Sequence, residues 1–141
     1  MKPSMFIAAS AAIILLLGFT HLWYTFRGPM LHPRDPALTA RMMTVSPVIT
    51  PGSTMWRLWI GFNSTHSFGL IFFGAVFGYL AVRHGAFLFQ SWVLLALGFA
   101  LLLGYAVVAK VYFFSAPFRG VALATVLYVL GIVVNVAQSK S

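Results

Sequence analysis

The sequence predicts an all-α membrane protein with four transmembrane helices. Of its 141 residues, 61% are hydrophobic and only 7% are charged, whereas a soluble domain carries about 25% charged residues. The mean hydropathy is +0.96. Four apolar stretches of about 20 residues, the length that crosses the hydrocarbon of a bilayer, occupy most of the chain. We therefore expect a single integral membrane domain over residues 1–141, folded as an up-down bundle.

The four expected spans lie at about residues 5–26, 55–82, 87–110 and 118–137. The first follows Lys2 and ends in an aromatic group before Arg27, a pattern typical of an uncleaved helix that ends in the membrane interface. Only short segments, residues 83–86 and 111–117, separate the last three spans. Short connections predict that these spans are sequential antiparallel neighbours.

Residues 27–54 form the only long loop between expected spans. The loop is rich in proline, with Pro29, Pro33, Pro36, Pro47 and Pro51. The HPRDP sequence at 32–36 disfavours regular helix, because each proline lacks a donor and restricts the residue before it. Residues 37–45 are compatible with a short helix that lies on the membrane surface or caps the bundle.

Charge and composition exclude several classes of function. Nine Lys and Arg oppose a single acid, Asp35. These bases stand singly at the ends of apolar runs, where they anchor helices to headgroups, so membrane lipid rather than nucleic acid is the expected partner. With one carboxylate and no cysteine, the chain lacks the side chains for a paired-carboxylate hydrolase or a thiolate metal site. No Walker, GxSxG, HExxH or GxGxxG pattern occurs, so no catalytic residues are predicted.

Polar side chains concentrate in the first half of the second span, where residues 63–67 read NSTHS. His66 there and His21 near the end of the first span lie at similar depths on the loop side. The candidates for a ligand pocket are His21, Asn63, His66, Ser67 and Lys110. Such a site would serve as a proton relay, a metal pair or a bis-histidine haem site. The structural alternative is a seam of interhelical hydrogen bonds, with Lys110 extended to the headgroups.

Gly74 and Gly78 have the GxxxG spacing that allows two helices to approach closely. Together with the small size and the missing catalytic set, this spacing favours a non-enzymatic accessory subunit. It would pack in a larger membrane assembly or in a homo-oligomer. The alternative is a binding or redox module that holds a quinone or haem beside His21 and His66. No cofactor and no metal is predicted for the leading interpretation.

Three patterns carry a resemblance to a known group of proteins. They are H-L-x-x-T-F at 21–26, M-M-x-V-S-P at 42–47 and M-W-x-x-W-I-G-F-N-x-T-H-S at 55–67. Over its first half, the chain is similar to a group of small bacterial four-helix membrane proteins without an assigned activity. The resemblance implies a four-helix fold in a bacterial inner membrane.

The orientation of the chain in the membrane stays open. Six bases on the loop side favour a cytoplasmic loop, whereas Lys2 beside the first span favours a cytoplasmic N-terminus.

Overall fold

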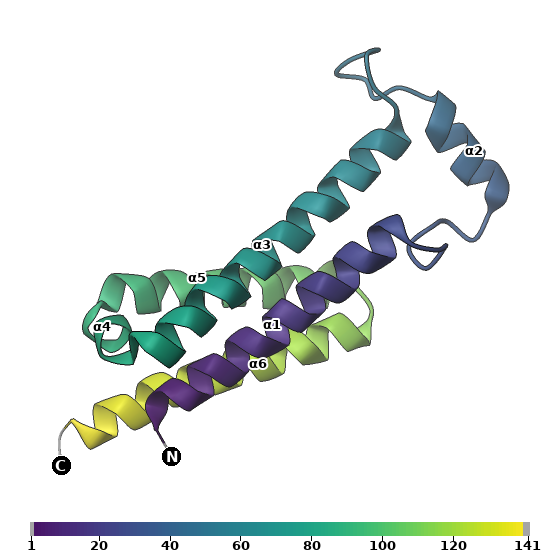
Figure 1. Ribbon diagram of the computed structural model, residues 1–141. Helices are drawn as coiled ribbons and strands as arrows, with labels where there is room; N and C mark the ends of the chain where they lie inside the picture. The colour runs from purple at the N-terminus through teal and green to yellow at the C-terminus, as the bar shows by residue number, and fades with distance from the viewer. Residues whose placement is uncertain (1, 140–141) are drawn as a thin grey trace. The chain divides into compact units, whose positions relative to one another are not determined.

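The computed structural model describes residues 2–139, in which the regular elements are all helices and no strand occurs. The helices are α1 (Pro3–Phe26), α2 (Pro36–Thr44), α3 (Met55–Arg83), α4 (Gly85–Gln90), α5 (Trp92–Tyr112) and α6 (Ser115–Gln138) (Figure 1). Four of them, α1, α3, α5 and α6, are long and apolar enough to cross a membrane. This confirms the all-α class and the expected number of candidate spans, and it indicates an integral membrane protein.

The helix expected at 87–110 is divided in two at Ser91. This residue has extended backbone angles, φ −95° and ψ 91°, and its side chain accepts a hydrogen bond from the Leu94 N–H at the start of α5. Serine is a preferred N-cap residue because its hydroxyl satisfies one of the unpaired N–H groups of a first helical turn. The apolar pattern continues through Ser91, so hydropathy alone merges α4 with α5.

The chain divides into two compact units, which we describe separately. The core unit comprises residues 1–17 and 70–141, and the loop unit comprises residues 18–69. Helices α1 and α3 each contribute one part to each unit, whereas α4, α5 and α6 belong wholly to the core unit.

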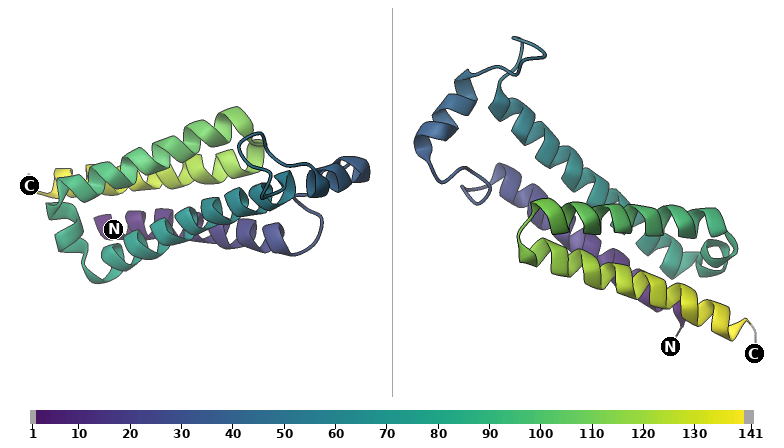
Figure 2. Two further views of the ribbon diagram at one scale, coloured as in Figure 1. Left: turned by 90° about the horizontal axis from the view of Figure 1, so that it is seen from above. Right: turned by 180° about the vertical axis from the view of Figure 1, so that it is seen from behind.

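The core unit is built around close helix contacts at glycines. Helices α5 and α6 run side by side in opposite directions, joined by a short connection (Figure 2). A Cβ atom added at Gly98 of α5 would meet the Tyr128 hydroxyl and would lie 2.7 Å from the Phe77 ring. One added at Gly131 of α6 would lie 2.8 Å from Ile7 Cγ1 of α1. Small residues therefore let four helical segments approach closely without a large apolar driving force, as is usual in lipid.

Within the loop unit, residues 27–54 connect the end of α1 to the start of α3 and include α2. Asp35 is the N-cap of α2, and its carboxylate accepts a hydrogen bond from the Ala37 N–H at 2.9 Å. Pro36 occupies the first helical position, where a missing N–H costs nothing. The Met55 N–H donates to the Val45 carbonyl at 2.9 Å, which ties the exit of α2 to the first residue of α3.

Candidate functional site

His21 of α1 and Asn63 of α3 are joined by a hydrogen bond inside the loop unit. The distance from His21 Nε2 to Asn63 Oδ1 is 2.9 Å, and Asn63 Nδ2 donates to the Trp59 carbonyl at 2.8 Å. Because a carbonyl only accepts, the amide nitrogen of Asn63 must face Trp59, and its oxygen is left to accept from His21. Neutral His21 therefore carries its proton on Nε2 and presents Nδ1 as an acceptor.

The ring of His66 lies edge-on to that of His21. The two ring centroids are 5.1 Å apart and the ring planes are inclined by 79°. His66 follows Asn63 by three residues on α3, so the two side chains lie on neighbouring positions of one helix face. The structure thus brings together three of the five residues expected to line a pocket. We call His21, Asn63 and His66 the His–Asn cluster.

Hydroxyl groups beside the cluster donate to their own helices. Ser67 is fully buried and donates to the Asn63 carbonyl at 2.8 Å. Thr25, which is 2% exposed, donates to the His21 carbonyl at 2.8 Å. Hydrogen bonds of this kind to the carbonyl four residues earlier satisfy a buried hydroxyl within one helix. Ser67 is therefore next to the cluster, but its only proton is already donated to the backbone.

Lys110, the fifth expected pocket residue, lies in the core unit. It occupies the last turn of α5 and is exposed. Its Nζ atom lies 5.0 Å from the centroid of the Phe118 ring, a cation–π distance. A cation near the C-terminus of a helix also interacts favourably with the helix dipole. The contact of Lys110 with Phe118 is thus a local one between α5 and α6.

Gly74 and Gly78 of α3 face α1 of the same chain. A Cβ atom at Gly74 would lie 2.6 Å from Leu15 Cβ and 2.8 Å from the Ala11 carbonyl oxygen. A Cβ atom at Gly78 would lie 3.5 Å from Ala11 Cβ, an ordinary contact distance. This GxxxG face is therefore covered from within the core unit. A contact with another protein needs a different surface.

Small residues also form a stripe on the outer face of α5. Ala96, Ala100 and Gly104 are spaced by four residues and are all exposed, and nothing lies within 4 Å of a Cβ added at Gly104. The opposite face of α5 carries the buried Gly98, Leu102 and Ala109. The spacing is visible in the sequence, but only the structure distinguishes this open stripe, which we call the α5 stripe, from the covered glycines of α3.

Sequence reasoning also missed an aromatic stack next to the cluster. The Trp56 and Trp59 rings are stacked with centroids 5.4 Å apart and planes 12° apart. The ring of His32, from the segment before α2, meets Trp56 edge-on at 4.8 Å. The spacing of three residues places the two tryptophans on one helix face. No sequence pattern indicates the contact with His32.

The geometry of the His–Asn cluster does not suit haem. Bis-histidine ligation places the two imidazoles on opposite faces of the macrocycle, but here the rings are in edge-to-face contact and leave no room between them. A structural zinc site needs four ligands. Within residues 2–139, no three His, Cys, Asp or Glu side chains lie close enough together to hold one metal ion. The arrangement suits a small ligand that accepts or donates hydrogen bonds, because an imidazole can do both.

Comparison of the chain with protein-family models, with curated proteins and with solved structures found no match.

Proposed function

We propose that this protein is an accessory or interaction subunit of a bacterial inner membrane, folded as a four-span up-down bundle. It associates through the α5 stripe with a transmembrane helix of a second copy or of another subunit. The observation that carries this proposal is the exposure of Ala96, Ala100 and Gly104 along one face of α5.

Two features of α5 support this assignment. Only 17% of its spanning segment is buried within the chain, against 22–33% for the other three spans. Lipid tails are as apolar as leucine, so helices in a membrane associate through close van der Waals packing, and small residues allow the closest approach. The α5 stripe offers two consecutive small-xxx-small steps on the helix that the rest of the chain covers least.

Cysteine crosslinking in native membranes tests the proposal directly, because the chain contains no cysteine. We expect an Ala100→Cys variant to form a disulfide-linked dimer on mild oxidation if the partner is a second copy. If the partner is another subunit, a photoreactive group on the same cysteine should give one discrete heavier product. A bulky Ala100→Ile change should abolish association in either case.

A matched control comes from α6. Val129 is 37% exposed and follows Tyr128, which contacts Gly98 of α5, so Val129 lies at about the depth of Ala100. A cysteine at this position samples random collisions at the same depth of the bilayer. Equal crosslinking at Ala100→Cys and Val129→Cys, or none at either position, would rule out the α5 stripe as an association surface.

The His–Asn cluster favours a second function, the binding of a lipid-soluble carbonyl ligand such as a quinone. The specific observation is that two imidazoles lie together: Asn63 orients His21 through a hydrogen bond, and the centroids of the His21 and His66 rings are 5.1 Å apart. An imidazole N–H donates a hydrogen bond, which is what a quinone carbonyl oxygen, an acceptor, requires of its partner. Ligand binding and subunit association are compatible, since they use different residues.

Tryptophan fluorescence provides the test, because the Trp59 carbonyl accepts a hydrogen bond from Asn63 Nδ2, which places Trp59 beside the cluster. Titration with a short-tailed benzoquinone should quench the wild-type emission at saturating amounts, and His21→Ala and Asn63→Ala should each raise the half-saturating concentration at least tenfold. Ser64→Ala is the control, since its hydroxyl donates to the Ile60 carbonyl. Unsaturable quenching that is the same in all four proteins would refute the ligand site.

A further inference from the structure

We infer that residues 27–54 of the loop unit lie in the headgroup layer of the bilayer and bind anionic phospholipid. The inference combines a surplus of arginine, exposed aliphatic side chains and the attachment of the segment to two spans. It does not depend on association through the α5 stripe or on a ligand at the His–Asn cluster.

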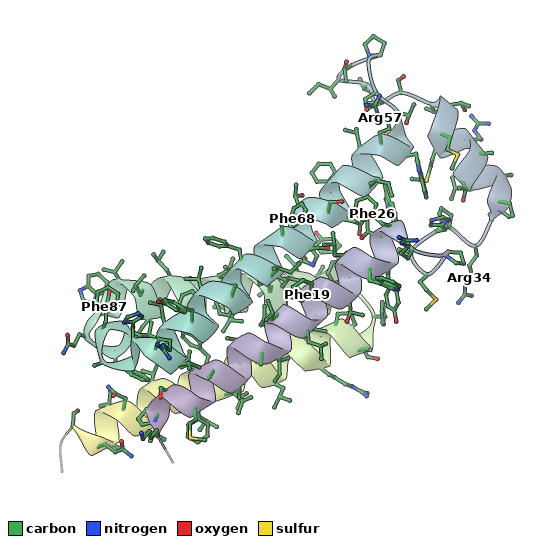
Figure 3. The ribbon with its side chains drawn as sticks, in the orientation of Figure 1. Phe19, Phe26, Arg34, Arg57, Phe68 and Phe87 are labelled. Atoms are coloured by element: carbon green, nitrogen blue, oxygen red, sulfur yellow. The ribbon has the colours of Figure 1, made fainter. Side chains whose placement is uncertain are left out.

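The positive charge of this region is almost uncompensated. Arg27, Arg34, Arg41 and Arg57 are all exposed, and the single acid of the chain is Asp35. The Asp35 carboxylate accepts the hydrogen bond from Ala37 that begins α2. Over residues 27–54, three arginines against one aspartate leave a net charge of +2, and Arg57 in the adjoining first turn of α3 raises it to +3. Arg34 lies on the connection into α2 and Arg57 in the first turn of α3, so separate segments carry the charge (Figure 3).

Aliphatic side chains project from the same segment. Val48 and Ile49 are 109% and 90% exposed at a turn in which the Thr50 N–H donates to the Pro47 carbonyl. Leu38 and Met43 of α2 are about half exposed, at 49% and 48%. Adjacent aliphatic residues at a loop tip are unfavourable in water, but they stabilise a segment that lies at the boundary between headgroups and acyl chains.

Both ends of the segment are fixed near the membrane surface. It begins directly after α1 and ends directly before α3, two of the four candidate spans. Trp23 near the end of α1 and Trp56 at the start of α3 are residues of the type that marks the interface. The Arg27 guanidinium lies 5.8 Å from the centroid of the Trp23 ring, which adds a cation–π contact at this level.

A groove beside α2 combines the two kinds of side chain. It has a volume of about 730 Å³, and its lining includes His32 and Arg34 together with the apolar Met30, Pro33 and Met43. Arginine recognises phosphate through its planar set of donors, while the methionines and prolines suit the glycerol and upper acyl region. This mixture distinguishes a phospholipid from an acidic soluble protein or a nucleic acid, neither of which needs the aliphatic contacts.

The experiment uses the full-length Ile49→Cys variant. An environment-sensitive fluorophore is attached to its single cysteine, and the labelled protein is reconstituted in vesicles. One vesicle contains about one-third phosphatidylglycerol and the other only phosphatidylcholine. We expect a blue-shifted emission and strong quenching by doxyl lipids in the anionic vesicles, and weaker effects in the neutral ones. High salt should reduce the difference, because it screens charges exposed to solvent.

Substitution of arginine tests the role of charge. Each arginine near an anionic surface contributes about fivefold to binding, so Arg34→Gln with Arg41→Gln should lower the preference for anionic vesicles by about 25-fold. Arg83→Gln, an exposed arginine at the end of α3 in the core unit, is the matched control and should change nothing. A label quenched equally in both vesicles would overturn the anionic preference. A label accessible to aqueous iodide in both would overturn the surface location as well.

Discussion

Asn63 of α3 links α1 to the backbone of α3, because its Oδ1 accepts from His21 Nε2 at 2.9 Å while its Nδ2 donates to the Trp59 carbonyl at 2.8 Å. Each half of the amide thus has a separate partner, which fixes both the orientation of the amide and the tautomer of neutral His21. The side chains of His21 and Asn63 are consequently held in a defined orientation relative to each other.

A double-mutant cycle on this pair measures how much the hydrogen bond contributes to stability. His21→Ala and Asn63→Ala should each lower the free energy of unfolding, and the double variant should lose less than the sum of the two. We expect a coupling energy of about 0.6 kcal/mol, with an upper bound of about 1.7 kcal/mol, the range for interhelical hydrogen bonds in membranes. Unfolding by SDS in mixed micelles provides the measurement. Strictly additive losses would show that the bond does not stabilise the fold.

The two glycines of the α3 GxxxG sequence should respond differently to alanine. At Gly74 the new Cβ would lie 2.6 Å from Leu15 Cβ and 2.8 Å from a backbone oxygen, so α1 must move away. Overpacking of this kind costs about 1–3 kcal/mol. At Gly78 the nearest atom would be 3.5 Å away, and we expect no loss of stability. The same SDS titration of Gly74→Ala and Gly78→Ala checks both, and equal effects would contradict the asymmetric packing.

Gly98→Ala should disturb the contact between α5 and α6 through side chains rather than backbone. Its Cβ would meet the Tyr128 hydroxyl, which donates to the Leu95 carbonyl at 3.3 Å, and would lie 2.7 Å from the Phe77 ring. We expect a loss of about 1–3 kcal/mol from this overpacking. Removal of the hydroxyl in Tyr128→Phe should restore part of the loss in the double variant. Failure of Tyr128→Phe to rescue any stability would place the strain at Phe77 instead.

The class of fold was predictable because it depends on composition and on the length of apolar runs. Both are one-dimensional properties, and the candidate spans α1, α3, α5 and α6 follow from them. The break at Ser91 was not predicted, since one capping residue stops a helix without altering the hydropathy around it. A preference for serine at helix N-termini is the only local signal there.

The candidate site was predictable in part for a similar reason. Equal depth along two helices suggested that His21 and His66 approach each other, and 1.5 Å per residue suffices for that estimate. Which side chains face each other also depends on how each helix is rotated about its axis, and this rotation could not be predicted from the sequence. Asn63 accepts from His21, whereas Ser67 on the same helix faces its own backbone and Gly74 faces α1. The open α5 stripe and the covered glycines of α3 have identical spacing and opposite environments.

Two buried serines provide a final comparison, because only one of them has a hydrogen-bond partner within residues 2–139. Ser10 of α1 is fully buried, and its hydroxyl has no partner among the described residues. Ser67 is equally buried, and its hydroxyl donates to the Asn63 carbonyl at 2.8 Å. An unsatisfied buried hydroxyl carries a desolvation penalty, whereas a satisfied one contributes a modest net stabilisation. Ser10→Ala should therefore stabilise the core unit by about 1 kcal/mol.

The matched variant Ser67→Ala should instead cost roughly 0.5–1 kcal/mol. Both substitutions remove one oxygen from a buried position of a spanning helix, so their side-chain volumes and helix propensities change equally. The two variants should therefore shift the SDS unfolding midpoint in opposite directions relative to wild type. This difference in sign reports the effect of the hydrogen bond alone. A loss of stability in Ser10→Ala would contradict this expectation. It would mean that the Ser10 hydroxyl has a hydrogen-bond partner in the membrane, either a water or a partner helix packed on that face of α1.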